Sequence, residues 1–314
     1  MKRMLTTLAV AALALGSTTA CEPPPPPASF TVNVAPGVTG GDATPGDGVC
    51  ETAPGNGVCT LDAAVQEGNA LGRADIHVPQ SVELETPLVL TETTITGHLA
   101  FISVYNYSLR DFEIRAPHLH VVTGALLSLE QVDLHVTGAT SVAGALAVHR
   151  SSFVGWLDVH AGAVVSMVNS IGGAWASTLP PPTTNAWITN RGTVLLRFSY
   201  LIRFGGVAGS SMGAAFVHTL DGGTTTVGAT LFERYSLTSP DCLGTPASSE
   251  GYNNAKGCGF AGPGDIDDGN PSYPLSDVPR GVAGCGTDIT IDFYGDPRPS
   301  PDFRPDHCSR GLWE

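Results

Sequence analysis

Charged side chains suited to polysaccharide chemistry occur through the middle of this 314-residue chain. Glycoside hydrolysis uses two nearby carboxyl groups, which the pairs Asp111 with Glu113 and Glu130 with Asp133 could supply. A lyase needs a base such as arginine, and the same region offers six: Arg110, Arg115, Arg150, Arg191, Arg197 and Arg203. Sequence spacing does not bring these groups together. Scattered solvated charges are therefore the simpler interpretation, and we assign no catalytic residue.

Histidines and tryptophans form a second group of candidates. Metal binding requires three or four converging ligands, and the histidines in question are His118, His120, His135, His149 and His160. His118 and His120 would share one strand face, but His149 and His160 stand at different distances from the neighbouring glycines. Three tryptophans could stack on sugars, although aromatic residues more often pack in a core: Trp156, Trp175 and Trp187. We expect surface histidines and packing tryptophans here.

An acidic segment near the C-terminus is the remaining metal candidate. Asp265, Asp267 and Asp268 lie in a stretch that ends Gly269-Asn270 and would suit weak calcium binding outside the cell. The segment lacks the ligand spacing of an EF-hand, and an Asp-Gly-Asn turn explains it equally well. No other cofactor is expected.

Seven cysteines divide into one near the N-terminus and a set of six. An even set in an exported chain indicates disulfides, although six cysteines allow 15 connectivities. Proximity favours three pairs: Cys50 with Cys59, Cys242 with Cys258, and Cys285 with Cys308. A zinc site would require closer pairs such as C-x-x-C, which the sequence lacks.

The first 20 residues have the pattern of an export signal. Lys2 and Arg3 precede an apolar run over residues 5–15, and Ala20 stands before Cys21. This arrangement resembles a bacterial lipoprotein signal, which implies that Cys21 is lipidated and anchors the protein to a membrane. Thr18 departs from that pattern and leaves ordinary secretion as the alternative. A proline-rich tether then covers residues 21–28.

Composition excludes one class of partner. The formal net charge is −14, and Lys256 is the only lysine after residue 20. Nucleic-acid binding needs a basic surface, so we expect no nucleic-acid partner. With 42% hydrophobic and 14% charged residues, the chain has enough apolar surface to fold.

A glycine-aligned repeat indicates the fold. Similar short apolar segments start at five glycines spaced 18 to 31 residues apart: Gly124, Gly144, Gly162, Gly192 and Gly223. A polar residue follows each glycine by seven positions: Gln131, Ser151, Asn169, Ser199 and Thr230. An apolar residue comes two positions later, except at Asp133: Phe153, Ile171, Leu201 and Phe232. This period predicts an all-β fold, a parallel β-helix over residues 84–239, with glycines and short polar residues stacked at its corners.

The ends of such a coil need caps. Residues 29–83 are expected to cap the N-terminal end with a short helix over residues 60–71, in which Thr60 is the N-cap. Residues 240–314 contain four cysteines and many Gly, Pro and Asp residues. We expect them to form an irregular, disulfide-rich C-terminal cap.

Two segments resemble known bacterial surface proteins. Asp47 to Cys50 followed by Cys59 to Ala70 resembles the CSLREA motif, with departures at residues 62–65. Glu250 to Asn253, Cys258 and the terminal stretch from Cys308 to Glu314 resemble choice-of-anchor Q proteins. The resemblance implies a right-handed parallel β-helix at the cell surface. It implies no particular reaction, because the family shares none.

These observations favour an exported, non-enzymatic protein of the cell envelope or the surrounding medium. Its expected role is structural, adhesive or glycan-binding, with a polysaccharide or another envelope component as partner. A polysaccharide lyase or glycoside hydrolase on the same scaffold is one alternative. A surface scaffold for a protein partner is another.

Overall fold

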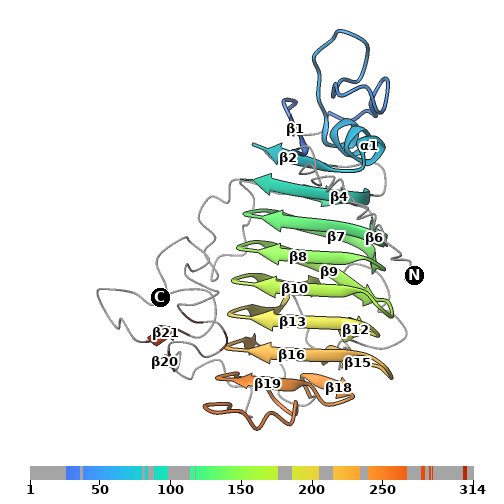
Figure 1. Cartoon of the computed structure of the whole chain (residues 1–314). Helices are drawn as coiled ribbons and strands as arrows, with labels where there is room; N and C mark the ends of the chain where they lie inside the picture. Colours follow the sequence, from blue (N-terminus) through green and yellow to red (C-terminus); the bar gives the residue numbers. More distant parts are fainter. Residues whose placement is uncertain are drawn as a thin grey trace, which may run out of the picture.

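The computed structural model describes residues 26–35, 38–79, 82–83, 88–97, 114–116, 118–175, 186–204, 215–233, 240–266, 277–279, 283, 285 and 307–309. These residues form a coil of stacked strands with one helix at its N-terminal end (Figure 1). Strands β1 to β19 belong to one sheet, and every strand pairing among them is parallel. The expected parallel β-helix is confirmed.

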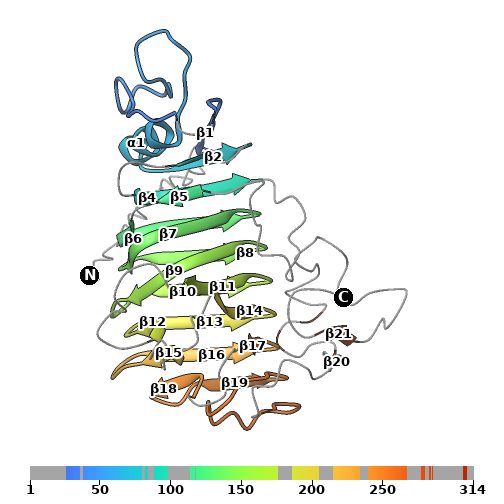
Figure 2. The ribbon, with the colours of Figure 1, turned by 180° about the vertical axis from the view of Figure 1, so that it is seen from behind.

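Each turn of the coil contributes strands to three stacks. The first stack contains β1 (Ala28–Thr31), β2 (Ala74–Val78), β4 (Leu88–Gly97), β6 (Leu119–Glu130), β8 (Ala145–His149), β10 (Val164–Val168), β13 (Thr193–Arg197), β16 (Thr224–Gly228) and β19 (Ser248–Gly251). The second, seen in Figure 2, contains β3 (Val82–Glu83), β5 (Ile114–Ala116), β7 (Asp133–Val142), β9 (Ser152–Val159), β11 (Ile171–Trp175), β14 (Tyr200–Phe204) and β17 (Leu231–Glu233).

The third stack uses the ends of strands already named and three further strands. The beginnings of β4 and β6 are followed by the C-terminal parts of β7 and β9, then β12 (Ala186–Asn190), β15 (Ala215–Thr219) and β18 (Cys242–Gly244). Parallel pairing thus extends beyond residues 84–239 at both ends. A separate antiparallel pair joins β20 (Asp277–Pro279) to β21 (His307–Ser309).

The core fills the space between the stacks. Alternate residues of β8, β10, β13 and β16 point inward, as Val165 and Met167 do in β10, and both are fully buried. In the second stack, Gly172 stands in register between Phe153 and Leu201. A Cβ at residue 172 would collide with the indole ring of Trp187. The small residue in one stack therefore accommodates a large one from the next strand of the same turn.

Both described tryptophan side chains pack inside the protein. Trp156 and Trp187 are 8% and 3% exposed, and the Trp187 Nε1 donates a hydrogen bond to the Gly155 carbonyl. The side chain of Trp175 lies outside the described residues. Packing, rather than sugar stacking, is the role of the two that are described.

At the corner that follows the first stack, the polar residue predicted from the repeat is displaced by one position in two of the turns. The first residue of the corner adopts a left-handed conformation in six successive turns, with φ between 47° and 59°: Gln131, Arg150, Asn169, Phe198, Ala229 and Tyr252. The next residue forms a buried ladder: Ser151, Ser170, Ser199 and Thr230. Gln131 and Asn169 were expected in that ladder, but they occupy the left-handed position one residue before it. Val132 and Ser170 stand at the ladder position instead.

Hydroxyl groups in this ladder satisfy buried backbone groups. Ser170 Oγ donates to a carbonyl oxygen, with Val148 O at 2.9 Å and Val168 O at 2.8 Å. Ser151 Oγ accepts a hydrogen bond from Val132 N at 3.1 Å. At a corner, buried backbone groups do not all pair with a neighbouring strand and need other hydrogen-bond partners. Short side chains with a hydroxyl group supply them, which explains the serines and the threonine at this corner.

The glycine corner shows the same one-residue shift. Strand register aligns Gly144, Gly192 and Gly223 with each other and with Ala125 and Ala163. At the three glycines a Cβ would press on backbone carbonyl oxygens of the preceding turn. The repeat glycines 124 and 162 lie one residue earlier, where the backbone has φ of +82°. Two different requirements for glycine therefore produced one apparent repeat.

The N-terminal end is closed by helix α1 (Leu61–Leu71), as predicted. Thr60 Oγ1 accepts a hydrogen bond from Ala63 N, and Gly72 ends the helix in a left-handed conformation. Glu67 is fully buried, and its carboxylate accepts hydrogen bonds from the backbone N–H groups of Gly46 and Gly48. The helix thereby holds the loop that carries the first disulfide.

The structure contains three disulfides: Cys50–Cys59, Cys242–Cys258 and Cys285–Cys308. They are the pairs that sequence proximity favours. Cys285 and Cys308 pack against Phe198 and Ala229, so this disulfide lies on the side of the coil rather than across its end. Disulfides form and persist in oxidising compartments, and these three indicate an extracytoplasmic environment.

Candidate functional site

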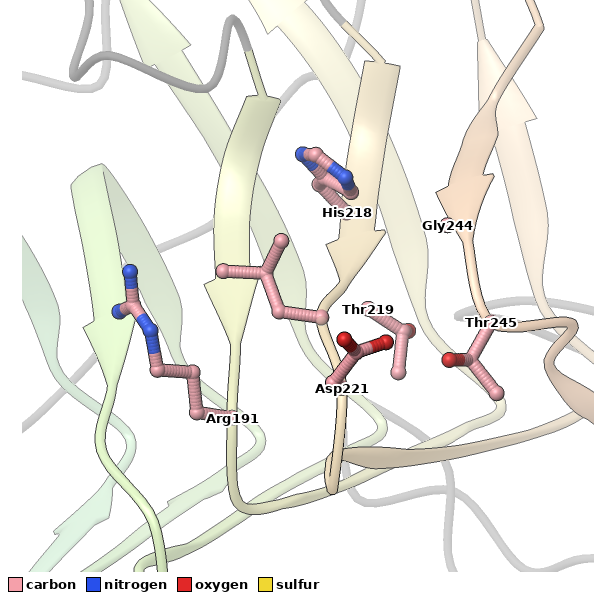
Figure 3. A pocket seen from close by; sticks show the side chains of 7 residues that line it. Arg191, His218, Thr219, Asp221, Gly244 and Thr245 are labelled. Atoms are coloured by element: carbon pink, nitrogen blue, oxygen red, sulfur yellow. The ribbon is translucent and has the colours of Figure 1, made fainter.

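A hollow of about 580 Å³ lies at the corner where the third stack leads into the first. Strands β12, β15 and β18 end there on three successive turns (Figure 3). Its lining consists of Arg191, His218, Thr219, Leu220, Asp221, Gly244 and Thr245. Because the strands are parallel and in register, equivalent positions of neighbouring turns repeat about every 4.8 Å along this corner.

A buried polar network supports the hollow from beneath. Thr219 Oγ1 and Thr225 Oγ1 are 2.7 Å apart, and Asn190 Nδ2 donates to the carbonyl of Thr224 at 2.8 Å. Asn190 Oδ1 accepts from the backbone N–H of Gly192 at 2.8 Å, which fixes the turn that carries Arg191. Fixed turns give the exposed side chains above them a defined spacing.

Polar side chains continue from the hollow along the same corner. Arg191 Nη1 lies 2.8 Å from Asp158 Oδ1, and His160 Nε2 lies 3.7 Å from Asp158 Oδ2. His160 Nε2 is also 2.9 Å from Ser141 Oγ. We use the term corner strip for Ser141, Asp158, His160, Arg191, His218 and Asp221. The side chains of Asp158, His160 and Arg191 are 45% to 48% exposed, so their ion pairs add little stability and remain accessible to a ligand.

The corner strip does not form a nucleophilic triad, although it contains Ser, His and Asp. In a triad the base contacts the nucleophile through one ring nitrogen and the orienting carboxylate through the other. Here Ser141 and Asp158 approach the same nitrogen of His160. Asp158 therefore cannot orient the ring for proton abstraction from Ser141. The arrangement is suited to binding hydroxyl and charged groups.

His218 is the most distinctive group in the wall of the hollow. Its Nδ1 is buried, and the described residues provide no hydrogen-bond partner for it. Buried polar atoms in folded proteins usually have a partner, so an unpaired nitrogen beside an open hollow is consistent with a ligand or water position. Asp221 and Thr245 face the same space (Figure 3).

The structure separates most of the charged candidates identified in the sequence. Of the arginines, Arg191 lines the hollow. Arg150 lies 3.6 Å from Glu130, and Arg197 Nε donates to Glu250 at 2.7 Å, both at the other corner of the first stack. Arg115 is exposed on β5. Outside the described residues lie Arg110, Asp111, Glu113 and the side chain of Arg203.

The carboxylate pair Glu130 and Asp133 also lies away from the hollow. Asp133 is 4% exposed at the start of β7, and burial raises the pKa of Glu130, an effect that nearby His149 and Arg150 partly offset. Burial likewise raises the pKa of Glu233 on β17. A raised carboxyl pKa can mark a general acid, but neither of these two glutamates lines the hollow.

Histidines and acidic residues do not converge on a metal site within the part of the chain that the structure describes. The rings of His118 and His120 stack with centroids 6.2 Å apart, whereas His149 and His160 lie at different corners. The carboxylate of Asp265 accepts hydrogen bonds from Ser249 Oγ, Gly262 N and Asn253 N, which is a structural role in the cap. Asp267, Asp268 and Cys21 lie outside the described residues.

Sequence reasoning missed four residues of the corner strip and one further residue that lines the hollow: Ser141, Asp158, His218 and Asp221, and Thr245. A partial signal was present, because Arg191 and Asp221 come one and two positions before the repeat glycines Gly192 and Gly223. Ser141, Asp158 and His218 lie three to five positions before their glycines, so this signal does not find them. Corner glycines mark positions where successive turns stack, so the residues just before them form a row.

The fold and the hollow define the class as a disulfide-containing parallel β-helix with a polar hollow at one corner. Comparisons with family models, curated proteins and solved structures find no match to this chain. The resemblance to CSLREA and choice-of-anchor Q proteins therefore stays a prediction based on the motif residues. Among the described residues, no helix is both long and apolar enough to span a membrane.

Proposed function

We propose that this protein is an exported, non-enzymatic β-helix protein of the cell envelope that binds glycans at the corner strip. The supporting observation is the hollow itself, in which side chains from three successive turns present a guanidinium, an imidazole, a carboxylate and a hydroxyl to the same space. Such groups recognise sugar hydroxyls and carboxylates through hydrogen bonds, which are directional and specific.

The repeating geometry also suits a polymer. Ser141, Asp158, Thr189 and His218 occupy one register position on β7, β9, β12 and β15. Thr189 is buried, and Arg191 supplies the exposed polar group of that turn, so polar groups recur along the coil axis. A glycan chain laid along this axis would meet a new set of donors and acceptors at each turn. Binding at several weak positions on one rigid surface increases the overall affinity.

Lipid attachment at Cys21 is the proposed means of holding the protein at a membrane. The three disulfides support export, and the proline-rich segment 21–28 would space the coil from the lipid. Mass spectrometry of the mature N-terminus in the native host tests this directly. A diacylglycerol-modified Cys21 is expected, and its loss in Cys21→Ser should release the protein into the medium. An unmodified Cys21 or cleavage elsewhere rejects the anchor.

Glycan binding is tested with a panel of soluble polysaccharides, both acidic and neutral, by affinity electrophoresis and calorimetry on the mature protein. Arg191→Ala and Asp221→Ala are expected to weaken binding by about tenfold each, since both remove a polar contact in the hollow. Arg150→Ala is the control, because Arg150 also lies beside a carboxylate, that of Glu130 at 3.6 Å, but at the other corner. If the control weakens binding equally, or if no glycan binds, the proposal fails.

A lyase or hydrolase on the same scaffold remains the second candidate, and one observation favours it. Arg191 and Asp221 line one hollow, with Asp158 contacting Arg191 from the adjacent turn, so one arginine and two carboxylates belong to one corner. The same polysaccharide panel should be assayed for unsaturated products and for new reducing ends. Turnover that Arg191→Ala abolishes would replace the binding function with an enzymatic one.

A further inference from the structure

Two adjacent columns on the outer face of the first stack contain no charged side chain over five consecutive strands. Two outward columns cross β6, β8, β10, β13 and β16 in register. One column contains Leu126, Ala145, Val164, Thr193 and Thr224, and the other contains Ser128, Ala147, Ser166, Leu195 and Thr226. We refer to these ten residues as the flat face. Figure 1 shows β8, β10, β13 and β16 stacked one above another.

The flat face is exposed and mixes methyl with hydroxyl groups. Val164 is 45% exposed and Leu126 is 40% exposed, which are high values for apolar side chains. Hydroxyls link neighbouring turns, with Thr224 Oγ1 3.3 Å from Thr193 Oγ1 and Thr226 Oγ1 2.9 Å from Ser248 Oγ. The side chains are therefore held in rows along the coil axis.

Charges border the flat face on both sides but do not enter it. The next outward column carries Glu130, His149 and Arg197, with contacts of Glu130 to His149 and of Arg197 to Glu250. The corner strip lies along the opposite border. In a chain of net charge −14, ten adjacent outward positions without a charge depart from the usual surface of a soluble sheet, where charges prevent association.

The net charge of the protein favours some partners for this face over others. A second copy would bring another net charge of −14 close to the first, and the flat face has no ionic groups to offset that repulsion. Binding of nucleic acid or of an acidic lipid surface is disfavoured for the same reason, since both are negatively charged. An uncharged polymer meets no repulsion, and its sugar rings present C–H faces and hydroxyls that match the methyl and hydroxyl rows.

We propose that the flat face binds the surface of an ordered, neutral polysaccharide, such as a crystalline β-linked glucan or chitin. Five strands about 4.8 Å apart give a rigid array roughly 19 Å long, over which weak contacts to a repeating ligand add together. The side chains are already ordered in the folded coil, so little conformational entropy is lost on binding. This site is separate from the hollow and does not depend on the hollow holding a ligand.

Sedimentation with microcrystalline cellulose and with chitin powder tests the flat face, using the mature protein. Val164→Glu and the double variant Val164→Glu with Thr193→Glu place charges at its centre and are expected to lower retention by about tenfold or more. Val38→Glu is the matched control, since Val38 is a 43% exposed valine of the N-terminal loop. Thermal unfolding of each variant establishes that it is folded.

Three outcomes would overturn the inference: wild-type protein that is not retained on any neutral solid, retention unchanged in folded Val164→Glu, or equal loss in Val38→Glu. Light scattering adds a fourth, because a wild-type dimer that Val164→Glu converts to a monomer would identify a second copy as the occupant. Arg191→Ala is expected to leave retention on solids unchanged, so failure of this site and failure of the hollow are distinguished.

Discussion

Ser170 illustrates how single hydroxyl groups hold the corner after the first stack. Its side chain is fully buried and donates to a backbone carbonyl, and its Oγ lies 3.4 Å from Ser151 N. In neighbouring turns the hydroxyls of Ser151, Ser199 and Thr230 likewise donate to the backbone carbonyl two residues earlier. A short side chain at this position therefore replaces hydrogen bonds that the backbone cannot make at a bend.

Removing this hydroxyl should be costly. Ser170→Ala removes the buried hydroxyl that contacts the Val148 and Val168 carbonyls and is expected to lower the free energy of unfolding by about 1–2 kcal/mol. Ser166→Ala is the control, because Ser166 lies outward on the neighbouring strand and should change stability by less than about 0.5 kcal/mol. Urea unfolding of both variants measures the difference. Equal losses in both would show that the buried ladder has no special role.

Glu233 gives a prediction that depends on pH. Burial raises its pKa above the ordinary value of 4.5, so the folded protein holds this proton more tightly than the unfolded chain does. The stability that this tighter proton binding gives the folded protein is complete below pH 4.5, and it is lost as the pH rises through the raised pKa. Glu233→Gln should therefore unfold at a higher temperature than wild type at pH 7, with the advantage disappearing near pH 4. Thermal unfolding across this range checks the sign, and a larger advantage at pH 4 would contradict it.

Elements of this coil are matched across the core as well as along each stack. Gly172 in β11 leaves the space that the Trp187 ring from β12 fills, with Met167 of β10 close by. The two residues belong to one turn but to different stacks. Their sizes are therefore coupled, and neither can be understood from its own strand alone.

This coupling predicts a pair of opposing changes. Gly172→Ala forces the indole ring to move and is expected to cost about 2–3 kcal/mol of stability. Trp187→Leu by itself leaves a cavity and also destabilises the protein. In the double variant the two effects should partly cancel, with a coupling energy on the order of 1 kcal/mol or more. Strictly additive losses in chemical unfolding would show that the residues do not share this space.

The glycine repeat predicted the architecture correctly but not the register of every turn. It grouped Gly124 and Gly162 with Gly144, although the first two serve a left-handed turn and the third stacks on a carbonyl oxygen. A sequence lists residue types, and both requirements select glycine. Asp133 looked like an exception for the same reason: with the correct register, Leu134 takes the apolar position beside Phe153.

At the scale of the whole molecule, Cys50–Cys59 and Cys242–Cys258 hold the two ends, and Cys285–Cys308 lies on the side of the coil. The sequence between Cys59 and Cys242 contains no cysteine. Loops of the length closed by these disulfides gain about 2–4 kcal/mol from a cross-link. Reduction should therefore lower the unfolding temperature, with proteolysis beginning in residues 38–58 and 240–266. Mass spectrometry of the first fragments tests the order. Initial cleavage within the strands of the central coil would contradict it.

The candidate site was harder to predict than the fold, because it depends on which residues from distant turns share a corner. Arg191 was identified by its type, but Asp158 and Asp221 lie 33 residues before it and 30 after it. The number of residues between turns varies, so spacing along the chain does not reveal that they lie on neighbouring turns. Only the strand register places them on one edge.

The attachment of β1 has a mechanical consequence. Parallel strands stacked along an axis peel apart one at a time when force is applied to the first strand. Just after β1, however, Asn33 N and Nδ2 donate to the carbonyls of Cys59 and Gly57, and its Oδ1 accepts from Cys59 N. A pull on the chain ahead of Ala28 would therefore be transmitted through Asn33 to the Cys50–Cys59 loop. That covalently closed loop would bear the load before the hydrogen bonds of the next turn do.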